Sequence, residues 1–148
     1  ETVWQPSHFS ADFNVALVRN AEQVMGNLQA KGEHVVDGRP SDRFEGAAPE
    51  PREGLASGHI PGSINIMPSQ FVAADSHTLL PSDAIAEQFT RAGITPDAPM
   101  LTTCGSGVAA SAITLARYLI TGEIAPVYDG SWSEWGALDN APVETVTS

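Results

Sequence analysis

The chain has 148 residues, a formal net charge of −11, 42% hydrophobic residues and 17% charged residues. This length is enough for one domain with a single core, and this composition is that of a globular protein rather than a disordered one. An acidic surface disfavours nucleic acid and anionic membranes as partners, and no apolar run approaches the ~20 residues of a membrane-spanning helix.

The first half of the chain is predicted to contain, in order, a strand, a helix, a second strand and a long irregular segment, over 14–18, 20–32, 33–37 and 40–63. Asn20 is the expected N-cap of the helix, and Gly32 its expected end. The irregular segment is rich in Pro, Gly and charged residues. Because loops of this length are uncommon inside a compact domain and are usually functional, we expect it to contribute to a site.

The second half continues with strand, helix, strand, helix, strand and short helix, over 64–66, 81–93, 98–104, 108–122, 126–130 and 131–138. Ser82 is the expected cap of the first of these helices, and Ser131 or Ser133 that of the last. Residues 143–148 are expected to form a frayed tail. The alternation predicts an α/β fold, with a central, mainly parallel sheet and helices on both faces.

The helix over 108–122 has an apolar side that is expected to pack against this sheet. The residues expected to be buried are Val108, Ile113, Leu115, Ala116 and Leu119. In the short helix, Trp132 and Trp135 are three positions apart and are expected to pack that helix onto the domain.

The only cysteine, Cys104, lies where a predicted strand meets a predicted helix. Ligands bind at the carboxyl ends of strands in parallel α/β sheets. Gly105 and Gly107 allow the loop to curl with several N–H groups pointing inward, and the helix that begins near Val108 adds its positive N-terminal end. Both features favour the thiolate, the reactive form of cysteine. The sequence therefore predicts a nucleophile inside an anion-binding loop.

Three known patterns compete for this segment. A phosphatase-type Cys-x5-Arg loop requires arginine at the sixth position after Cys104, where the chain has Ala110. A dinucleotide fingerprint, G-x-G-x-x-A, fits residues 105–110, and Asp129 ends the next strand at about the expected distance. The third pattern is a six-residue loop that begins with a catalytic cysteine, which is typical of sulfurtransferases.

Four linked motifs resemble the rhodanese family in order and spacing. They are VVDGRPSDRFEG (35–46), PEPREGLASGHIPGSINI (49–66), CGSGVAA (104–110) and YDGSWSEWG (128–136). The resemblance is to the C-terminal, catalytic half of the tandem-domain 3-mercaptopyruvate sulfurtransferases. It implies a rhodanese-like fold and a single domain over residues 1–148, with the N-terminal half of the enzyme absent. Since the chain does not begin with methionine, we expect it to be a fragment or a processed product.

The resemblance also implies a reaction and its residues. Cys104 would take the sulfur of 3-mercaptopyruvate as a persulfide and pass it to a thiol acceptor such as thioredoxin, or to cyanide, without a cofactor or a metal ion. Arg43 and Arg52 match the positions that hold the substrate carboxylate. The expected binding loop consists of Gly105, Ser106, Gly107, Val108 and Ala109. Two alternatives stay open: a thiosulfate sulfurtransferase, and a non-catalytic module that only carries a persulfide.

Other polar residues of these motifs are interpreted as structural. Asp37 is expected to be a scaffold carboxylate at a strand end, with Arg39 paired to an acidic neighbour. His59, between glycine and proline residues, is expected to stabilise a rigid turn. An isolated catalytic half would expose the apolar surface that faces its partner half, which favours an N-terminal rhodanese half or self-association as a partner. The free thiol and the absence of a signal-peptide pattern favour a cytoplasmic location.

Overall fold

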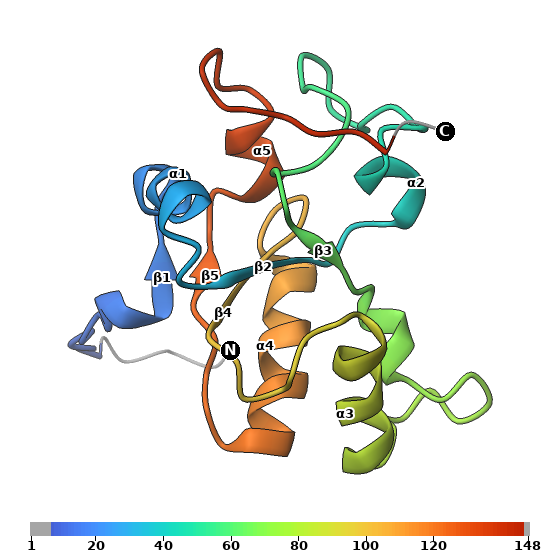
Figure 1. Ribbon diagram of the computed structural model, residues 1–148. Coiled ribbons are helices and arrows are strands. Elements are labelled where there is room, and N and C mark those ends of the chain that lie inside the picture. The colour runs from blue at the N-terminus through green and yellow to red at the C-terminus, as the bar shows by residue number, and fades with distance from the viewer. Residues whose placement is uncertain (1–6, 147–148) are drawn as a thin grey trace, which may run out of the picture.

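A computed structural model describes residues 7–146 as an α/β domain built on a parallel sheet (Figure 1). The five strands are β1 (Val18–Arg19), β2 (His34–Asp37), β3 (Ile64–Asn65), β4 (Met100–Thr103) and β5 (Val127–Tyr128). They lie in the order β1-β5-β4-β2-β3, and every neighbouring pair is parallel. The predicted fold class is therefore confirmed, and β4, which leads to Cys104, lies at the centre of the sheet.

Helices cover both faces of the sheet (Figure 1). The α-helices are α1 (Ala21–Ala30), α2 (Ser41–Phe44), α3 (Ser82–Arg91), α4 (Val108–Thr121) and α5 (Ser131–Trp135), and the 3-10 helices are η1 (Val15–Leu17) and η2 (Pro68–Phe71). One core cluster joins α3, α4 and η2 to one face, with Phe89 and Ile113 fully buried. The other joins α1 and α5 to the opposite face through Trp132 and Trp135, which confirms their predicted packing role.

The helix ends show how local sequence sets the boundaries. Asn20 caps α1 in a reciprocal capping box with Gln23, as its residue type predicts. Lys31, rather than Gly32, takes the left-handed conformation that ends this helix. Ser82 was expected to cap α3, but it is the first helical residue, and the cap position belongs to Pro81, whose ring leaves no side-chain cap.

The cap predicted for α5 is also wrong. The cap position belongs to Gly130, and Ser131 is the first helical residue, with a φ of +50°. The side chains of Ser131 and Ser133 instead contact the loop that contains Cys104. These two hydroxyls thus link α5 to the loop rather than cap the helix.

The exposed face of α4 differs from the prediction. Ile113 and Ala116 are buried, but Val108, Leu115 and Leu119 are 79%, 49% and 47% exposed. These three residues and Ala112 follow one another at helical spacing, so they form a stripe on the side away from the sheet. We call Val108, Ala112, Leu115 and Leu119 the α4 stripe.

The predicted frayed tail is fixed to the domain over residues 143–146, which we call the C-terminal strap. Glu144 exchanges backbone hydrogen bonds with His59 at 2.8 and 2.9 Å, and the Val146 N–H donates to Glu45 at 3.1 Å. Glycine residues in the segment between α2 and β3 make room for the strap. At Gly46, for example, a Cβ would lie 2.9 Å from Thr145 Cγ2. Residues 147–148 of the predicted tail lie outside the described residues.

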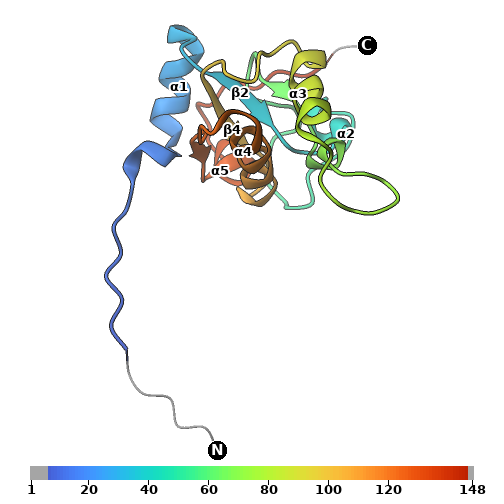
Figure 2. The same cartoon turned by 90° about the horizontal axis from the view of Figure 1, so that it is seen from below.

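The N-terminal part of the described chain leaves the domain. Residues 7–13 run outward before η1, and Phe9 and Phe13 are 86% and 70% exposed (Figure 2). The strand predicted over 14–18 is shorter than expected, because Asn14 caps the 3-10 turn of η1 and leaves only Val18–Arg19 to pair with β5. No helix among residues 7–146 is both long and apolar enough to cross a membrane.

Candidate active site

Cys104 lies directly after β4, at the carboxyl edge of the sheet. Its side chain is almost fully buried, and its sulfur accepts a hydrogen bond from the Gly107 N–H at 3.1 Å. Gly107 has a φ of +86°, which favours glycine, and it is the N-cap of α4. The turn therefore directs a backbone donor and the positive end of a 14-residue helix toward the sulfur.

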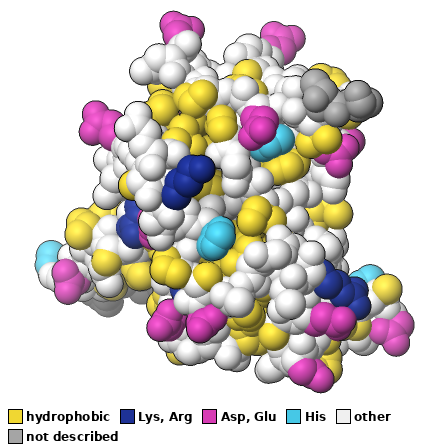
Figure 3. Space-filling view, viewed as in Figure 1, with side chains coloured by type: hydrophobic (Ala, Val, Ile, Leu, Met, Phe, Trp, Pro, Cys, Tyr) yellow, Lys and Arg dark blue, Asp and Glu magenta, His cyan; other side chains and the backbone are white. Residues whose placement is uncertain are grey.

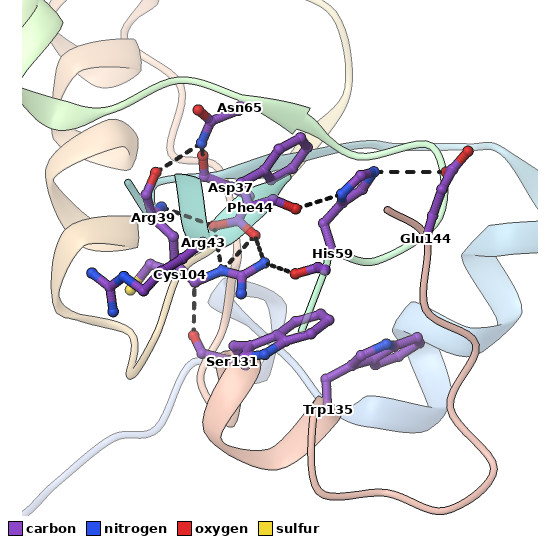
Figure 4. Close-up of polar contacts among 12 residues, drawn as sticks. Asp37, Arg39, Arg43, Phe44, His59, Asn65, Cys104, Ser131, Trp135 and Glu144 are labelled. Atoms are coloured by element: carbon purple, nitrogen blue, oxygen red, sulfur yellow. Dashed lines mark hydrogen bonds and ion pairs between the residues drawn. The ribbon is translucent and has the colours of Figure 1, made fainter. Parts of the chain in front are cut away.

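The start of α5 supports the backbone of this loop from below (Figure 4). The Cys104 N–H donates to the Ser131 hydroxyl at 3.3 Å, and the Trp132 N–H donates to the Cys104 carbonyl at 2.8 Å. The Ser133 N–H donates to the Gly105 carbonyl at 3.0 Å. Because polar atoms on both sides of Cys104 have partners, the position of the thiol is fixed by α5 as well as by β4.

A hollow of about 400 Å³ opens onto the thiol. It is lined by residues from the loop after β2, α2, the start of η2, the Cys104 loop and α4: Gly38, Arg39, Pro40, Arg43, Pro68, Cys104, Gly105, Ser106, Val108, Ala109 and Ala112. This volume can hold a small substrate such as a three-carbon acid. The hollow also borders the α4 stripe, through Val108 and Ala112.

A second, smaller hollow of about 130 Å³ lies on the other side of Gly105 and Ser106. Arg43 lines both hollows, while Arg52 and Glu50 line only the smaller one. The Arg52 guanidinium donates to the Ser133 hydroxyl, which in turn donates to the Gly105 carbonyl. A chain of hydrogen bonds thus connects Arg52 to the residue that follows the cysteine.

A buried ion network lies next to these hollows. The Arg39 guanidinium, 1% exposed, donates to both oxygens of Asp37 (Figure 4). It donates as well to the Gly58 carbonyl at 2.7 Å and to Glu50 Oε1 at 2.8 Å. It also lies 4.0 Å from the centroid of the Trp132 ring. The predicted pairing of Arg39 and the scaffold role of Asp37 are confirmed.

Glu50 is a part of the site that the sequence analysis missed. Its side chain is 3% exposed, and its second oxygen, Oε2, lies 3.7 Å from the guanidinium of Arg43. Glu50 precedes Arg52 by two residues in the PEPR segment. This closeness to a predicted substrate-binding residue could have identified Glu50 as part of the site. A buried carboxylate thus connects the structural Arg39 to Arg43, which faces the hollows.

His59 stabilises the loop that contains these residues. It is buried, its Nδ1 lies 2.7 Å from the Phe44 carbonyl oxygen at the end of α2, and its ring stacks on Phe44 at 3.9 Å. Its Nε2 lies 3.8 Å from Glu144 of the C-terminal strap. These contacts agree with the structural role predicted for His59 and place it away from the thiol (Figure 4).

The protein as a whole is acidic, with 18 Asp and Glu residues against 7 Lys and Arg residues. On the face shown in Figure 3, acidic side chains lie around the outline of the molecule and basic side chains are few. Arg43 and Arg52 therefore supply a local positive charge on a protein of net charge −11. Within residues 7–146, no group of three or more His, Cys, Asp or Glu side chains is arranged to hold a metal ion.

The structure brings the predicted site residues to one edge of the sheet. Arg43 and Arg52, far from Cys104 in sequence, lie beside its loop, and Gly105, Ser106, Val108 and Ala109 line the hollows. Gly107 is buried behind the loop, where its N–H faces the sulfur. A nucleophile, backbone donors and two guanidinium groups in one place can bind a small anion and attack it.

Comparison with known proteins agrees with this geometry. The family profile described as "Rhodanese-like domain" matches residues 20–138. The 3-mercaptopyruvate sulfurtransferase of Mus musculus is 39% identical over 131 residues, which cover 88% of this chain and 44% of the relative. An Arabidopsis thaliana protein, thiosulfate/3-mercaptopyruvate sulfurtransferase 1, mitochondrial, is 36% identical over 143 residues, which cover 97% of this chain and 38% of the relative.

A solved structure shows the same similarity. SseA from Escherichia coli, described as a 3-mercaptopyruvate sulfotransferase with a rhodanese fold, matches with a TM-score of 0.70 and 31% identity. The match covers 86% of this chain and 46% of that chain. The present chain therefore spans less than half the length of each of these relatives.

Proposed function

The chain belongs to the rhodanese family, and on this premise we propose that it is a sulfurtransferase that takes sulfur from 3-mercaptopyruvate onto Cys104. The observation that carries the proposal is the position of the buried thiol, which opens onto a hollow that Arg43 also lines. Relatives from mouse and Arabidopsis are named for this donor, which supports the same assignment.

In the first half-reaction, the Cys104 thiolate attacks the sulfur of 3-mercaptopyruvate. A sulfur–sulfur bond forms as the carbon–sulfur bond breaks, and the electron pair goes to the carbon, which takes a proton to give pyruvate. In the second, a thiol acceptor attacks the outer sulfur and releases the Cys104 thiolate. No external oxidant is needed, because the carbon of the donor accepts the electron pair that the transferred sulfur gives up.

Two guanidinium groups hold the donor in this proposal. Arg43 faces the hollow that contains the thiol, and Arg52 is held against the loop through Ser133. Guanidinium groups bind carboxylates through paired, charge-assisted hydrogen bonds. The donor carboxylate then lies over Gly105 and Ser106, with its sulfur directed toward Cys104.

The loop from Gly105 to Ala109 stabilises the negative charge on sulfur. The Gly107 N–H already donates to the sulfur at 3.1 Å, and the N-terminal end of α4 lies behind it. Backbone donors that are in place before the reaction stabilise developing charge without reorganising. The same donors suit both the thiolate and the persulfide, so each half-reaction benefits from them.

The exposed α4 stripe beside the site supports a proposal about the partners of this chain. The α4 stripe is apolar and continues the wall of the hollow at Val108 and Ala112. We propose that this stripe is covered by an N-terminal rhodanese half or by a second copy of the chain, and that a thiol such as thioredoxin accepts the sulfur. The cytoplasmic location stays a prediction, which cell fractionation can test.

Intact mass after mixing the chain with a donor, without acceptor, tests the proposal. We expect a gain of one sulfur atom with 3-mercaptopyruvate, and no gain in Cys104→Ser. A gain from thiosulfate alone would keep the sulfurtransferase class and overturn the assigned donor. No gain from either donor, even with an N-terminal half added, would overturn the proposed function.

Arg43→Ala separates an enzyme from the alternative, a module that only carries a persulfide. An enzyme loses affinity for 3-mercaptopyruvate, because the carboxylate loses a guanidinium partner. A carrier still accepts sulfur from a persulfide donor and shows no such loss. The contact of Arg43 with the thiol hollow favours the enzyme.

A further inference from the structure

We propose that Glu50 sets the charge preference of the site, favouring singly charged sulfur donors over doubly charged ones. This inference rests on the proposed function and adds a residue that determines specificity. It starts from an unusual position for a carboxylate: Glu50 lines the smaller hollow, beside the two arginines that face an anionic donor.

The geometry of Glu50 keeps its charge effective. Its side chain is 3% exposed, so little water screens it. Oε1 accepts from Arg39 at 2.8 Å, while Oε2 lies at 3.7 Å from Arg43. The first contact anchors the carboxylate, and the second is loose enough that Arg43 can turn its other donors toward a ligand.

The charges around the hollows leave a small positive excess. Arg43 and Arg52 are the guanidinium groups that line the smaller hollow, and Glu50 is its carboxylate, so these three side chains carry a net charge of +1. Arg39 lines the larger hollow, but its charge is offset by its ion pairs with Asp37 and Glu50. The remaining excess of one positive charge matches a donor with one carboxylate, and a second negative charge on the donor has no partner.

The two candidate donors differ in the number of negative charges that they carry. 3-Mercaptopyruvate binds through one carboxylate, whereas thiosulfate carries two negative charges. Repulsion from Glu50 scales with the charge of the donor, so it disfavours thiosulfate more. Removing the charge of Glu50 should therefore improve the use of thiosulfate relative to 3-mercaptopyruvate.

Glu50→Gln tests this with little change in shape, because the amide oxygen of glutamine can still accept from Arg39. We expect the ratio of kcat/KM for thiosulfate to kcat/KM for 3-mercaptopyruvate to rise about three- to tenfold. Glu53→Gln is the matched control: it removes the same charge from an exposed residue of the same loop. Its ratio should stay within a factor of about two of wild type, because solvent screens exposed charges.

An unchanged ratio in Glu50→Gln, or an equal rise in Glu53→Gln, would overturn the proposal. Absence of sulfur transfer from both donors in the wild-type chain would instead overturn the proposed function, so the two failures are distinguishable. A second measurement covers the case in which Glu50→Gln does not fold. In the wild-type chain, acetate should protect Cys104 from iodoacetamide at lower concentration than sulfate does, and the reverse order would also overturn the proposal.

Discussion

Ser131 lies beneath Cys104 and holds its backbone: the Ser131 hydroxyl accepts from the Cys104 N–H at 3.3 Å and donates to the Tyr128 carbonyl at 2.9 Å. Ser131 is fully buried and has a φ of +50°, a conformation that costs free energy for any residue with a Cβ. Ser131 thus joins the end of β5 to the loop that contains Cys104, although its own backbone is strained. Its contacts offset the strain, since they satisfy two buried backbone groups.

Ser131→Ala should weaken both stability and catalysis. The variant keeps the strained backbone but leaves two buried polar groups without partners, which costs about 1–3 kcal/mol of unfolding free energy. Urea unfolding measures this loss, and the rate of sulfur gain by intact mass measures loading of Cys104, which we expect to slow. Ser76→Ala, in an exposed loop, serves as the control; equal behaviour of the two variants would contradict the assigned role.

Arg52→Ala should raise KM for 3-mercaptopyruvate about tenfold or more, because the donor loses a charge-assisted hydrogen bond. The effect on kcat should be small, since Arg52 contacts the loop through Ser133 rather than through the thiol. Steady-state kinetics measure both constants. Arg91→Ala removes the same charge from an exposed helix position that pairs with Glu87, and a similar rise in KM there would contradict a local role for Arg52.

The raised pKa of Tyr128 predicts that the protein loses stability at alkaline pH. Burial, and then the hydrogen bond from its hydroxyl to Glu134 at 2.7 Å, raise the pKa of Tyr128 above that of a free tyrosine. Since the folded state holds this proton more tightly than the unfolded state, the contribution is complete below the unfolded pKa of about 10 and is lost as pH rises above it. Urea midpoints between neutral pH and pH ~10.5 should therefore fall more steeply in wild type than in Tyr128→Phe. Parallel curves would contradict the assignment.

Alanine substitutions at Gly46 and Gly54 distinguish the cost of backbone strain from the cost of a clash with the C-terminal strap. Their φ angles are +82° and +80°, so alanine brings similar strain at both. A Cβ on Gly54 meets nothing within 4 Å, whereas one on Gly46 lies 2.9 Å from Thr145 Cγ2. Gly46→Ala should therefore cost about 1 kcal/mol more than Gly54→Ala in thermal or urea unfolding.

Thr145→Ser provides the rescue for this pair, because it removes Cγ2 and keeps the hydroxyl. In the Gly46→Ala background, it should recover most of the extra loss. Equal stability of the two alanine variants would mean that the strap yields without cost. No recovery in the double variant would mean that the extra loss does not come from Thr145 Cγ2.

Much of the fold follows from local sequence. The alternation of apolar runs with helical patterns predicts the parallel sheet, and Asn20 and Gly122 mark helix ends because they suit the backbone there. The faces of α4 were less predictable. Its residues are apolar almost all round, so periodicity alone could not tell that Leu115 and Leu119 point away from the sheet.

The site, too, has a part that the sequence predicts and a part that only the folded structure shows. Cys104, Arg43 and Arg52 stand in recognisable motifs, and the structure places them together. Glu50 was missed because its importance depends on Arg39, eleven residues before it, which reaches it only in the folded loop. The strap was missed for the same reason: its partners lie more than eighty residues earlier in the chain, and nothing in VETV shows that Glu144 pairs with His59.

The strap also makes the C-terminus an internal reporter on the site. The Val146 amide hydrogen is bonded to Glu45, two residues after Arg43, and the Glu144 amide is bonded to His59, whose ring stacks on Phe44 beside Arg43. A donor that steadies Arg43 also steadies α2, and these two amides should then exchange with deuterium more slowly. Occupancy of the site can thus be followed by mass spectrometry of a C-terminal peptide, without a label on the donor or on Cys104.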